Sequence, residues 1–341
     1  MKIEDFIRPD LLDIKPYSAA RDEFVANSQN LVMLDANENN LAEQYNRYPS
    51  SNQLELRNAM AQKLNVLAPQ IMFGNGSDEV IDLIIRLFAA PFQDSMIVCE
   101  PTYGMYRVTA KLNGVKVLDI PLNDSFEPDL TAIKSSSAKL LWICNPNNPT
   151  GNVLKPSQIA DIVESFKGIV VVDEAYIDFC KENSVVSLIE KYPSLIVIQT
   201  FSKAKGLAGL RLGYAIANSA TIAWLLAIKP PYSINSYTYT TALRQLQDNN
   251  WKQWITKINL EKERVVKALE GMPIVNKVFP SAANFILFEV ENANELYQYL
   301  IEQGVVIRSR NKQIKSTLRV TIGTKKENDL FLKNLKEWQT N

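Results

Sequence analysis

The chain contains no histidine among its 341 residues. Histidine is the commonest general base and the commonest metal ligand in proteins, so its absence excludes a serine triad of the usual kind. We therefore expect no metal site, and any catalytic base must be another side chain. Lysine is the leading candidate for that base.

Cysteine, excess charge and long apolar runs are also scarce. The three cysteines, Cys99, Cys144 and Cys180, are few and odd in number, which favours reduced thiols and a cytoplasmic protein. Lys and Arg number 37, as do Asp and Glu, so no charge excess favours nucleic acid or an anionic membrane as a partner. We find no apolar run of about 18 residues, so we expect no transmembrane helix. The N-terminus also lacks the apolar stretch of a signal peptide.

Short apolar segments alternate with helix-like segments between about residues 70 and 215. The expected strands lie near 96–99, 140–144, 169–172 and 195–198, and the expected helices over 77–88, which Ser77 would cap, and 156–166. Continuous apolar strands alternating with helices predict an α/β fold, with a mostly parallel sheet between helices. Ligands of such sheets bind beyond the carboxyl ends of the strands.

The pattern after residue 250 predicts a long helix and then a small α+β unit. The helix would cover 251–269, followed by strands near 284–290, 305–307 and 318–322 and by helices over 293–303 and 326–338. We therefore expect an N-terminal segment (1–35) that packs with the small domain, a large domain (36–270) and a small C-terminal α+β domain (271–341). The length of the chain suits this division.

The segment from Ser202 to Gly213 brings a hydroxyl, an amine and a guanidinium together after an apolar strand. Ser202 and Arg211 can both bind a phosphate, while Lys203 can condense with an aldehyde. Most lysines in loops are simply solvated, and we assign that ordinary role to Lys205. The small residues of the segment let its backbone pass close to a bound group.

Other strand ends carry polar groups that suit a flat ring. Asp173 ends one strand, where it would either cap the next helix or keep a pyridine nitrogen protonated. Tyr176 could hydrogen-bond a phenolic oxygen of such a ring. Asn148 lies in a stiff turn with two Asn-Pro steps and would donate to the same oxygen. The alternative is an ordinary Pro/Asn/Gly turn that contacts no ligand. Tyr103 would stack on the ring or simply pack in the core.

A glycine-rich turn at Gly76, Ser77 and Asp78 leads into a predicted helix. The free N–H groups at the start of a helix attract a phosphate. Such turns are common, so this turn taken alone has low specificity as a signal for phosphate binding.

Taken in order, the segments GNGSDE, PTYGMY, NPNNPTG, VVDEAY and TFSKAKGLAGLRLGY resemble the fold-type I enzymes that use pyridoxal 5'-phosphate. Within that group the chain resembles the histidinol-phosphate aminotransferases. Further matches are Asn37-Glu38, Arg47-Tyr48-Pro49, KPPYSIN at 229–235, the segment at 280–285 and LRVTIGT at 318–324. The matches span residues 16 to 324, nearly the whole chain.

The resemblance implies a role for each matching residue. Lys203 would bind the cofactor as a Schiff base and later move a proton, Asp173 would pair with the pyridine nitrogen, Asn148 and Tyr176 would contact the phenolic oxygen, and Tyr103 would stack on the ring. The cofactor phosphate would be held by Ser202, Arg211, Gly76, Ser77 and Asp78, and by Tyr48 of the neighbouring subunit. This last residue implies a homodimer with shared active sites. The substrate-binding residues would be Tyr17, Asn37, Arg308 and Arg319.

The resemblance also implies a reaction. It is the transamination of L-histidinol phosphate with 2-oxoglutarate, giving imidazole-acetol phosphate and glutamate, in L-histidine biosynthesis. A broader aromatic amino-acid aminotransferase and a pyridoxal-phosphate-dependent decarboxylase of a phosphorylated amino acid remain open as alternatives. The complete set of cofactor residues argues against a catalytically silent regulator. The segment between Arg308 and Arg319 is shorter than is usual in the family, which leaves open how the substrate phosphate is held.

Overall fold

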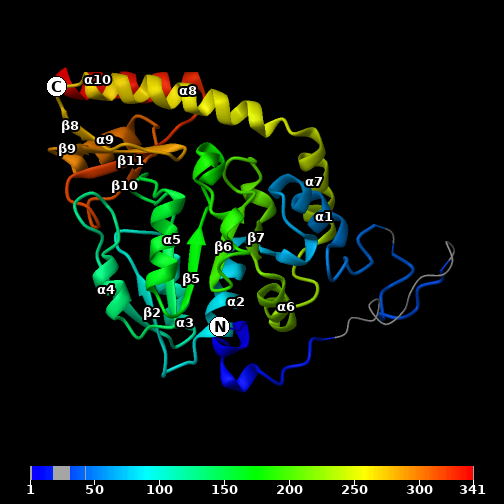
Figure 1. Cartoon of the computed structure of the whole chain (residues 1–341). Coiled ribbons are helices and arrows are strands. Elements are labelled where there is room, and N and C mark those ends of the chain that lie inside the picture. Colours follow the sequence, from blue (N-terminus) through cyan, green and yellow to red (C-terminus); the bar gives the residue numbers. More distant parts are fainter. Residues whose placement is uncertain (1, 18–30, 43, 341) are drawn as a thin grey trace.

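Seven apolar segments form the main sheet of the protein, for which a computed structural model describes residues 2–17, 31–42 and 44–340 (Figure 1). The strands are β1 (Ile71–Asn75), β2 (Ser95–Val98), β3 (Lys116–Asp119), β4 (Leu140–Cys144), β5 (Ile169–Asp173), β6 (Leu195–Thr200) and β7 (Leu212–Ala217). Their order across the sheet is β1-β7-β6-β5-β4-β2-β3. Neighbouring strands are parallel except β7, which is antiparallel to both β1 and β6. The predicted α/β fold with a mostly parallel sheet is confirmed.

The strand directions bring the polar segments to one edge of the sheet. Strands β4, β5 and β6 are parallel, so the loops after Cys144, Asp173 and Thr200 leave from the same edge. Strand β1 also ends at this edge, because it is antiparallel to β7, which is in turn antiparallel to β6. Strand β7 begins there, directly after Arg211. The strand directions therefore bring residues that are far apart in the sequence to the same edge of the sheet.

Helices cover both faces of this sheet. On one face the core includes side chains of α1 (Leu54–Leu64), α4 (Leu130–Ser135), α5 (Pro156–Ser165) and α7 (Ser236–Asp248). On the other it includes those of α2 (Gly76–Phe88), α3 (Met105–Leu112) and α6 (Ser219–Ile228). Alternate residues of β5 from Ile169 to Val172 enter the two cores, which explains why the strand is apolar up to its last residue, Asp173.

The start of the chain packs against the large domain. Ile3 and Ile7 are buried in the core on the α2 side of the sheet, and Arg8 Nη1 donates to the carbonyl of Arg86 at 3.0 Å. The prediction that residues 1–35 pack with the small domain is therefore wrong for residues 3–8. Ile3 lies in a 3-10 turn (Ile3–Asp5) and Ile7 follows it two residues later, and the large domain buries both side chains. Residues 18–30 of this segment lie outside the described residues.

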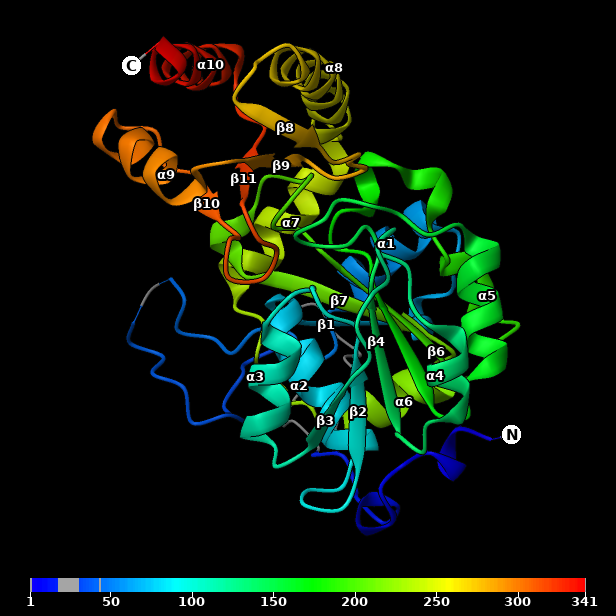
Figure 2. The same ribbon diagram turned by 90° about the vertical axis from the view of Figure 1, so that its left-hand side faces the viewer.

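The small domain is an antiparallel sheet covered by helices. Its strands are β8 (Val275–Val278), β9 (Phe285–Val290), β10 (Arg308–Ser309) and β11 (Thr317–Thr321), in the order β10-β11-β9-β8. Helices α8 (Trp251–Glu270), α9 (Ala293–Glu302) and α10 (Lys325–Thr340) pack against it, and both views place this unit at one end of the large domain (Figures 1 and 2). Val265 and Leu269 of α8 already belong to the small core, ahead of the boundary predicted at residue 270.

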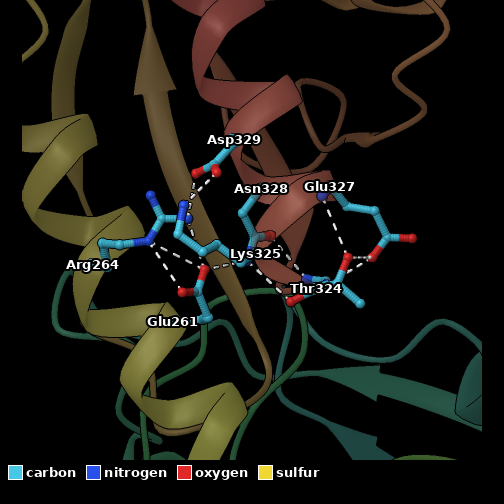
Figure 3. A network of polar contacts seen from close by, with 8 residues as sticks. Glu261, Arg264, Thr324, Lys325, Glu327, Asn328 and Asp329 are labelled. Carbon is cyan, nitrogen blue, oxygen red and sulfur yellow. Dashed lines mark hydrogen bonds and ion pairs between the residues drawn. The ribbon is translucent and has the colours of Figure 1, made fainter.

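Polar contacts join the start of α10 to α8 (Figure 3). Arg264 Nη2 lies 2.7 Å from Glu261 Oε2 and 2.9 Å from Asp329 Oδ1, while Asn328 Nδ2 donates to Glu261 Oε2 at 2.9 Å. Thr324 and Glu327 form reciprocal hydrogen bonds, the Thr324 N–H to the carboxylate at 2.7 Å and the Glu327 N–H to the hydroxyl at 3.4 Å. This capping box satisfies backbone donors at the start of the helix. The two helices are thereby fixed above β11, which carries Arg319.

The three cysteines are buried and free, and burial raises the pKa of each thiol to about 12. Protonated, buried thiols of this kind are weak nucleophiles. No helix in the described part of the chain has the length and apolar character needed to cross a membrane. Across the same residues we find no cluster of three or more histidine, cysteine or carboxylate side chains able to hold a metal ion.

Candidate active site

A cavity of about 650 Å³ opens where the carboxyl edge of the main sheet faces β10 and β11 of the small domain. It collects most of the residues that the sequence singled out. Those lining it are Ser77, Asp78, Tyr103, Asn148, Asp173, Tyr176, Ser202, Lys203, Arg211, Arg308 and Arg319. Residues separated by more than 200 positions in the sequence therefore share one pocket, and both domains contribute to it.

Three predicted residues lie elsewhere in the single chain. Tyr48 and Asn37 line a second hollow, of about 670 Å³, together with Tyr232. Tyr48 stacks on Tyr232, with ring centroids 4.5 Å apart and an angle of 20° between the planes. Tyr17 is 69% exposed and does not line the cavity around Lys203, as far as the described residues define it.

Lys203 follows β6 and presents its amine to the cavity. Its Nζ lies 5.4 Å from the ring centroid of Tyr176. The side chain of Lys203 is exposed to the open cavity, but the protein around it desolvates the ammonium, and this desolvation is the main cause that lowers the pKa of Lys203. The positive charge of Arg319 lowers this pKa further, and Asp173 opposes it. A lowered pKa is what an amine needs in order to act as a nucleophile or a base.

Lys205 is buried rather than solvated, so the ordinary role that we assigned to it from the sequence is wrong. Its Nζ lies 2.6 Å from Asp178 Oδ2, and its side chain is 3% exposed. The ammonium also lies 4.8 Å from the ring centroid of Trp251 and 5.4 Å from that of Phe201. A carboxylate and two aromatic faces compensate the buried charge, and all of them come from other segments of the chain.

Asp173 is buried at the end of β5, and both of its carboxylate oxygens accept hydrogen bonds. The Tyr106 hydroxyl donates to Oδ2 at 2.6 Å, and the Ala175 N–H donates to Oδ1 at 3.0 Å. Burial raises the pKa of Asp173 to about 6, while the Tyr106 hydrogen bond opposes this rise. Asp173 does not cap the next 3-10 helix, which begins at Ile177. The carboxylate thus has a fixed orientation toward the cavity.

Tyr106 is a functional residue that the sequence did not reveal. It is fully buried in α3 and stacks on Trp142 of β4, with ring centroids 5.0 Å apart. Its own environment is therefore that of a core aromatic, and only its hydroxyl reaches Asp173. The sequence places the two residues 67 positions apart, which is why no local pattern connected them.

The start of α2 and the segment before β7 form the opposite end of the cavity. Gly76 has a φ of +76°, and a Cβ at this position would lie 2.7 Å from Arg211 Nη2. A Cβ on Gly213 would lie 2.3 Å from the backbone N of Ser77, so β7 also needs a glycine to approach the helix. The helix begins at Gly76 with Asn75 as its N-cap, so the prediction that Ser77 caps it is wrong. Ser77 lies instead in the first turn, where backbone N–H groups have no partner within the helix.

Asp78 organises this end of the cavity with its side chain. Its Oδ2 lies 3.1 Å from Arg211 Nη2, and its Oδ1 accepts a hydrogen bond from the Tyr103 hydroxyl at 3.2 Å. A carboxylate repels a phosphate, so the side chain of Asp78 positions Arg211 and Tyr103. A direct contribution of this residue to phosphate binding would come from its backbone N–H.

Three arginines occupy the wall supplied by the small domain. Arg308 in β10 lies directly opposite Arg319 in β11, and Arg310 follows two residues after Arg308. Arg319 Nη1 donates to Asn148 Oδ1, which leaves the amide N–H groups of Asn148 available to another acceptor. Arg310 was not predicted from the sequence. The signal was the spacing Arg-Ser-Arg, because residues two apart on a strand share a face.

The residues in this cavity fit the cofactor implied by the resemblance. A buried carboxylate (Asp173) suits a protonated pyridine nitrogen, and Lys203 supplies the amine for its aldehyde. At the other end, Arg211, the hydroxyls of Ser77 and Ser202 and a helix start suit a phosphate. The missing Cβ at Gly76 lets the Arg211 guanidinium lie against the start of the helix. The donor and acceptor set therefore matches pyridoxal phosphate from one end to the other.

Comparisons with known proteins give the same family. A histidinol-phosphate aminotransferase of Flavobacterium psychrophilum is 42% identical over 339 residues, which cover 98% of each chain. The crystal structure of the histidinol-phosphate aminotransferase from Clostridium acetobutylicum has a TM-score of 0.80 at 29% identity, covering 87% of this chain and 92% of that one. The L-threonine-O-3-phosphate decarboxylase from Porphyromonas gingivalis has a TM-score of 0.76 at 25% identity, over 87% and 92% of the two chains. The model of the family "Aminotransferase class I and II" matches residues 25–335, and the chain belongs to this family.

Proposed function

We propose that this protein transfers the amino group of L-histidinol phosphate to 2-oxoglutarate, with pyridoxal 5'-phosphate as cofactor and in the service of L-histidine biosynthesis. One observation carries the proposal: the amine of Lys203 shares a cavity with three arginines on the small-domain wall. An amine substrate with a phosphate needs a base at one end and cations at the other. The relative of 42% identity, which bears the name of this activity, supports the choice of substrate.

The chemistry needs a base that acts on the substrate carbon bearing the amine. Pyridoxal phosphate, when bound, supplies an aldehyde and an electron-withdrawing ring. Among the described residues that line the cavity, Lys203 carries the one amine, and its pKa is lowered. Arginines stay protonated at neutral pH, so they cannot take its place. Lys203 therefore anchors the cofactor first and moves the proton afterwards.

The other cavity residues hold and orient the cofactor in this proposal. Asp173 keeps the ring nitrogen protonated, and its two hydrogen bonds fix the direction of its carboxylate. Asn148 and Tyr176 donate to the phenolic oxygen, and Tyr103 stacks on the ring. The cofactor phosphate is bound by Arg211, Ser202, Ser77 and the backbone at Gly76 and Asp78.

We also propose a homodimer with shared active sites. Tyr48 and Asn37 lie in a hollow apart from Lys203, so in a single chain they do not reach its cavity. A second subunit would bring Tyr48 to the cofactor phosphate of its neighbour, and Asn37 and Tyr17 to the substrate side. Tyr48 is 49% exposed and Tyr237 is 57% exposed, which leaves aromatic surface for such a contact. The cytoplasmic location suggested by the reduced cysteines remains part of this proposal.

A purified-enzyme assay tests the function. Histidinol phosphate should react with 2-oxoglutarate far faster than histidinol, phenylalanine or tyrosine do, because a buried cation left without its anion is costly. Equal rates with the aromatic amino acids would favour the broader aromatic aminotransferase. Lys203→Ala should lose both turnover and the yellow chromophore that borohydride reduces, whereas Lys315→Ala, at an exposed position outside the cavity, should keep both.

A decarboxylase is the second candidate, since the similar enzyme from Porphyromonas gingivalis also acts on a phosphorylated compound. The identity to that protein is 25%, against 42% to the Flavobacterium aminotransferase, which favours transamination. The two reactions differ in a simple readout. Release of carbon dioxide from a phosphorylated amino acid, with no need for a keto acid, would show that decarboxylation is the reaction.

A further inference from the structure

Arg310 lies in the wall of the cavity that holds Lys203, on the same side as Arg308. Its backbone N–H donates to the carbonyl of Thr317 at 3.0 Å, so the ladder between β10 and β11 continues one residue beyond Ser309. Side chains two residues apart on a strand point to the same face of a sheet. Arg308 and Arg310 are therefore neighbours on one face, and Arg319 lies opposite Arg308 on that face.

The charge of this cluster has no counterpart among the residues that the structure describes. In residues 2–17, 31–42 and 44–340 we find no carboxylate within ion-pair distance of Arg308, Arg310 or Arg319. Arg310 is half-buried, and this burial is the main cause that lowers its pKa to about 10, with smaller contributions from the charges of Arg319 and Arg308. Such a group of partly desolvated like charges is unfavourable unless an anion joins it.

The hydrogen bonds of Arg310 also leave donors free. Its Nη1 donates to Gln313 Oε1 at 3.1 Å, but its Nε is buried and has no partner among the described residues. Nε of Arg319 is likewise buried without a partner, although Nη1 of that residue is held by Asn148. A buried donor without an acceptor costs free energy, so both guanidinium groups are poised for a ligand with several oxygens.

We propose that Arg310 is a specificity-determining residue that binds the phosphate of the substrate together with Arg308. This inference rests on the proposed function, and it names the residue that compensates for the short segment between Arg308 and Arg319. A phosphate dianion carries two charges and three terminal oxygens, enough for two guanidinium forks, whereas a carboxylate carries one charge and two oxygens. Arg319, tied to Asn148, lies nearer the Lys203 end of the cavity.

The test compares Arg310→Gln and Arg310→Lys in the holoenzyme, with Lys315→Gln as the matched control for a lost positive charge in the same loop. The readout is kcat/KM with histidinol phosphate and with histidinol. Arg310→Gln should lower kcat/KM for histidinol phosphate about tenfold to a hundredfold, the worth of one hydrogen-bonded charge, and leave histidinol unchanged. Arg310→Lys keeps the charge without the fork and should fall between the wild type and Arg310→Gln.

Competitive inhibition by inorganic phosphate supplies a second readout that does not depend on the natural substrate. Its inhibition constant should rise about tenfold in Arg310→Gln and stay unchanged in Lys315→Gln. An equal loss with both amines, or an unchanged inhibition constant, would overturn the assignment. If the wild type fails to prefer histidinol phosphate, the proposed function is wrong, and the phosphate inhibition alone then decides the role of Arg310. Far-UV circular dichroism checks that each variant is folded. If Arg310→Gln is unfolded, the kinetic constants of Arg310→Lys decide the role of Arg310 instead.

Discussion

The buried ion pair between Lys205 and Asp178 gives the strongest stability prediction for this protein. The two charged atoms are 2.6 Å apart, and the side chains are 3% and 13% exposed. Replacement of Asp178 by alanine leaves the Lys205 ammonium in contact with Trp251 and Phe201 but without a counter-ion. Lys205 lies two residues from Lys203, so the pair also holds the loop that carries the proposed catalytic amine.

The magnitude follows from the opposing effects of attraction and desolvation. At 2.6 Å and an effective dielectric constant of about 20, the attraction amounts to about 6 kcal/mol. Desolvation of the two groups offsets much of this, and removal of one partner from a buried pair costs about 3–5 kcal/mol. We therefore expect Asp178→Ala to lower the free energy of unfolding by about 3–5 kcal/mol. The double variant Asp178→Leu, Lys205→Met removes both charges and should stay within about 1 kcal/mol of the wild type.

Urea unfolding of the cofactor-free protein, followed by far-UV circular dichroism, measures these differences. The matched control is Glu164→Ala, because Glu164 pairs with Lys191 on the surface, where the side chains are 57% and 66% exposed. Exposed pairs contribute less than about 1 kcal/mol, so this variant should be nearly as stable as the wild type. If Asp178→Ala lowers the free energy of unfolding no more than Glu164→Ala does, burial of the Lys205 charge does not make this pair more stabilising than an exposed one. A double variant as unstable as Asp178→Ala would refute the reasoning in the same way.

Two further predictions concern the cofactor site. Tyr106→Phe removes the hydroxyl that donates to Asp173 at 2.6 Å, so the pKa of Asp173 should rise above its value of about 6, by about one unit. Because the ionised carboxylate is the form that pairs with a pyridinium, the acid limb of the pH profile of kcat/KM should move to higher pH; an unmoved limb would contradict this role. Gly76→Ala forces an alanine to a φ of +76°, at a strain of about 1–2 kcal/mol, and pushes the Arg211 guanidinium away. Titration of the apoenzyme with pyridoxal phosphate should show at least about tenfold weaker binding, and wild-type affinity would argue against Arg211 as a phosphate ligand.

The sequence predicted the parts of the structure that depend on local patterns. The strand over 140–144 is observed with the same bounds, and that over 169–172 extends by one residue to Asp173, because continuous apolar runs must be buried on both faces of a sheet. The polar segments after the strands meet at one edge because parallel strands point the same way. Local chemistry and one topological rule thus sufficed to place most of the cavity residues.

Residues whose roles depend on partners distant in the sequence were not predicted. Lys205 looks like any loop lysine until Asp178, 27 positions earlier, is found beside it. Tyr106 looks like a core aromatic, and its hydroxyl gains meaning from Asp173 alone. Arg310 carried a visible pattern with Arg308, but its burial and its free Nε are consequences of domain packing. These residues differ from the predicted ones because their partners are distant in the sequence, and no local sequence pattern reveals such a pairing.

The absence of histidine makes the arginines of the small domain important for the base as well as for the substrate. Desolvation is the main cause that lowers the pKa of Lys203, and the charges of Arg319 and Arg211 lower it further. An anion that binds beside Arg319 offsets its positive charge, so the pKa of Lys203 should rise when substrate occupies the cavity. An amine of higher pKa is a stronger base, and it is needed in that role once the substrate is in place. Desolvation and the two arginines together therefore keep the pKa of Lys203 low while the anion site is empty. In the proposed reaction, an anion that fills the site would raise this pKa, which would couple anion recognition to proton transfer without any histidine.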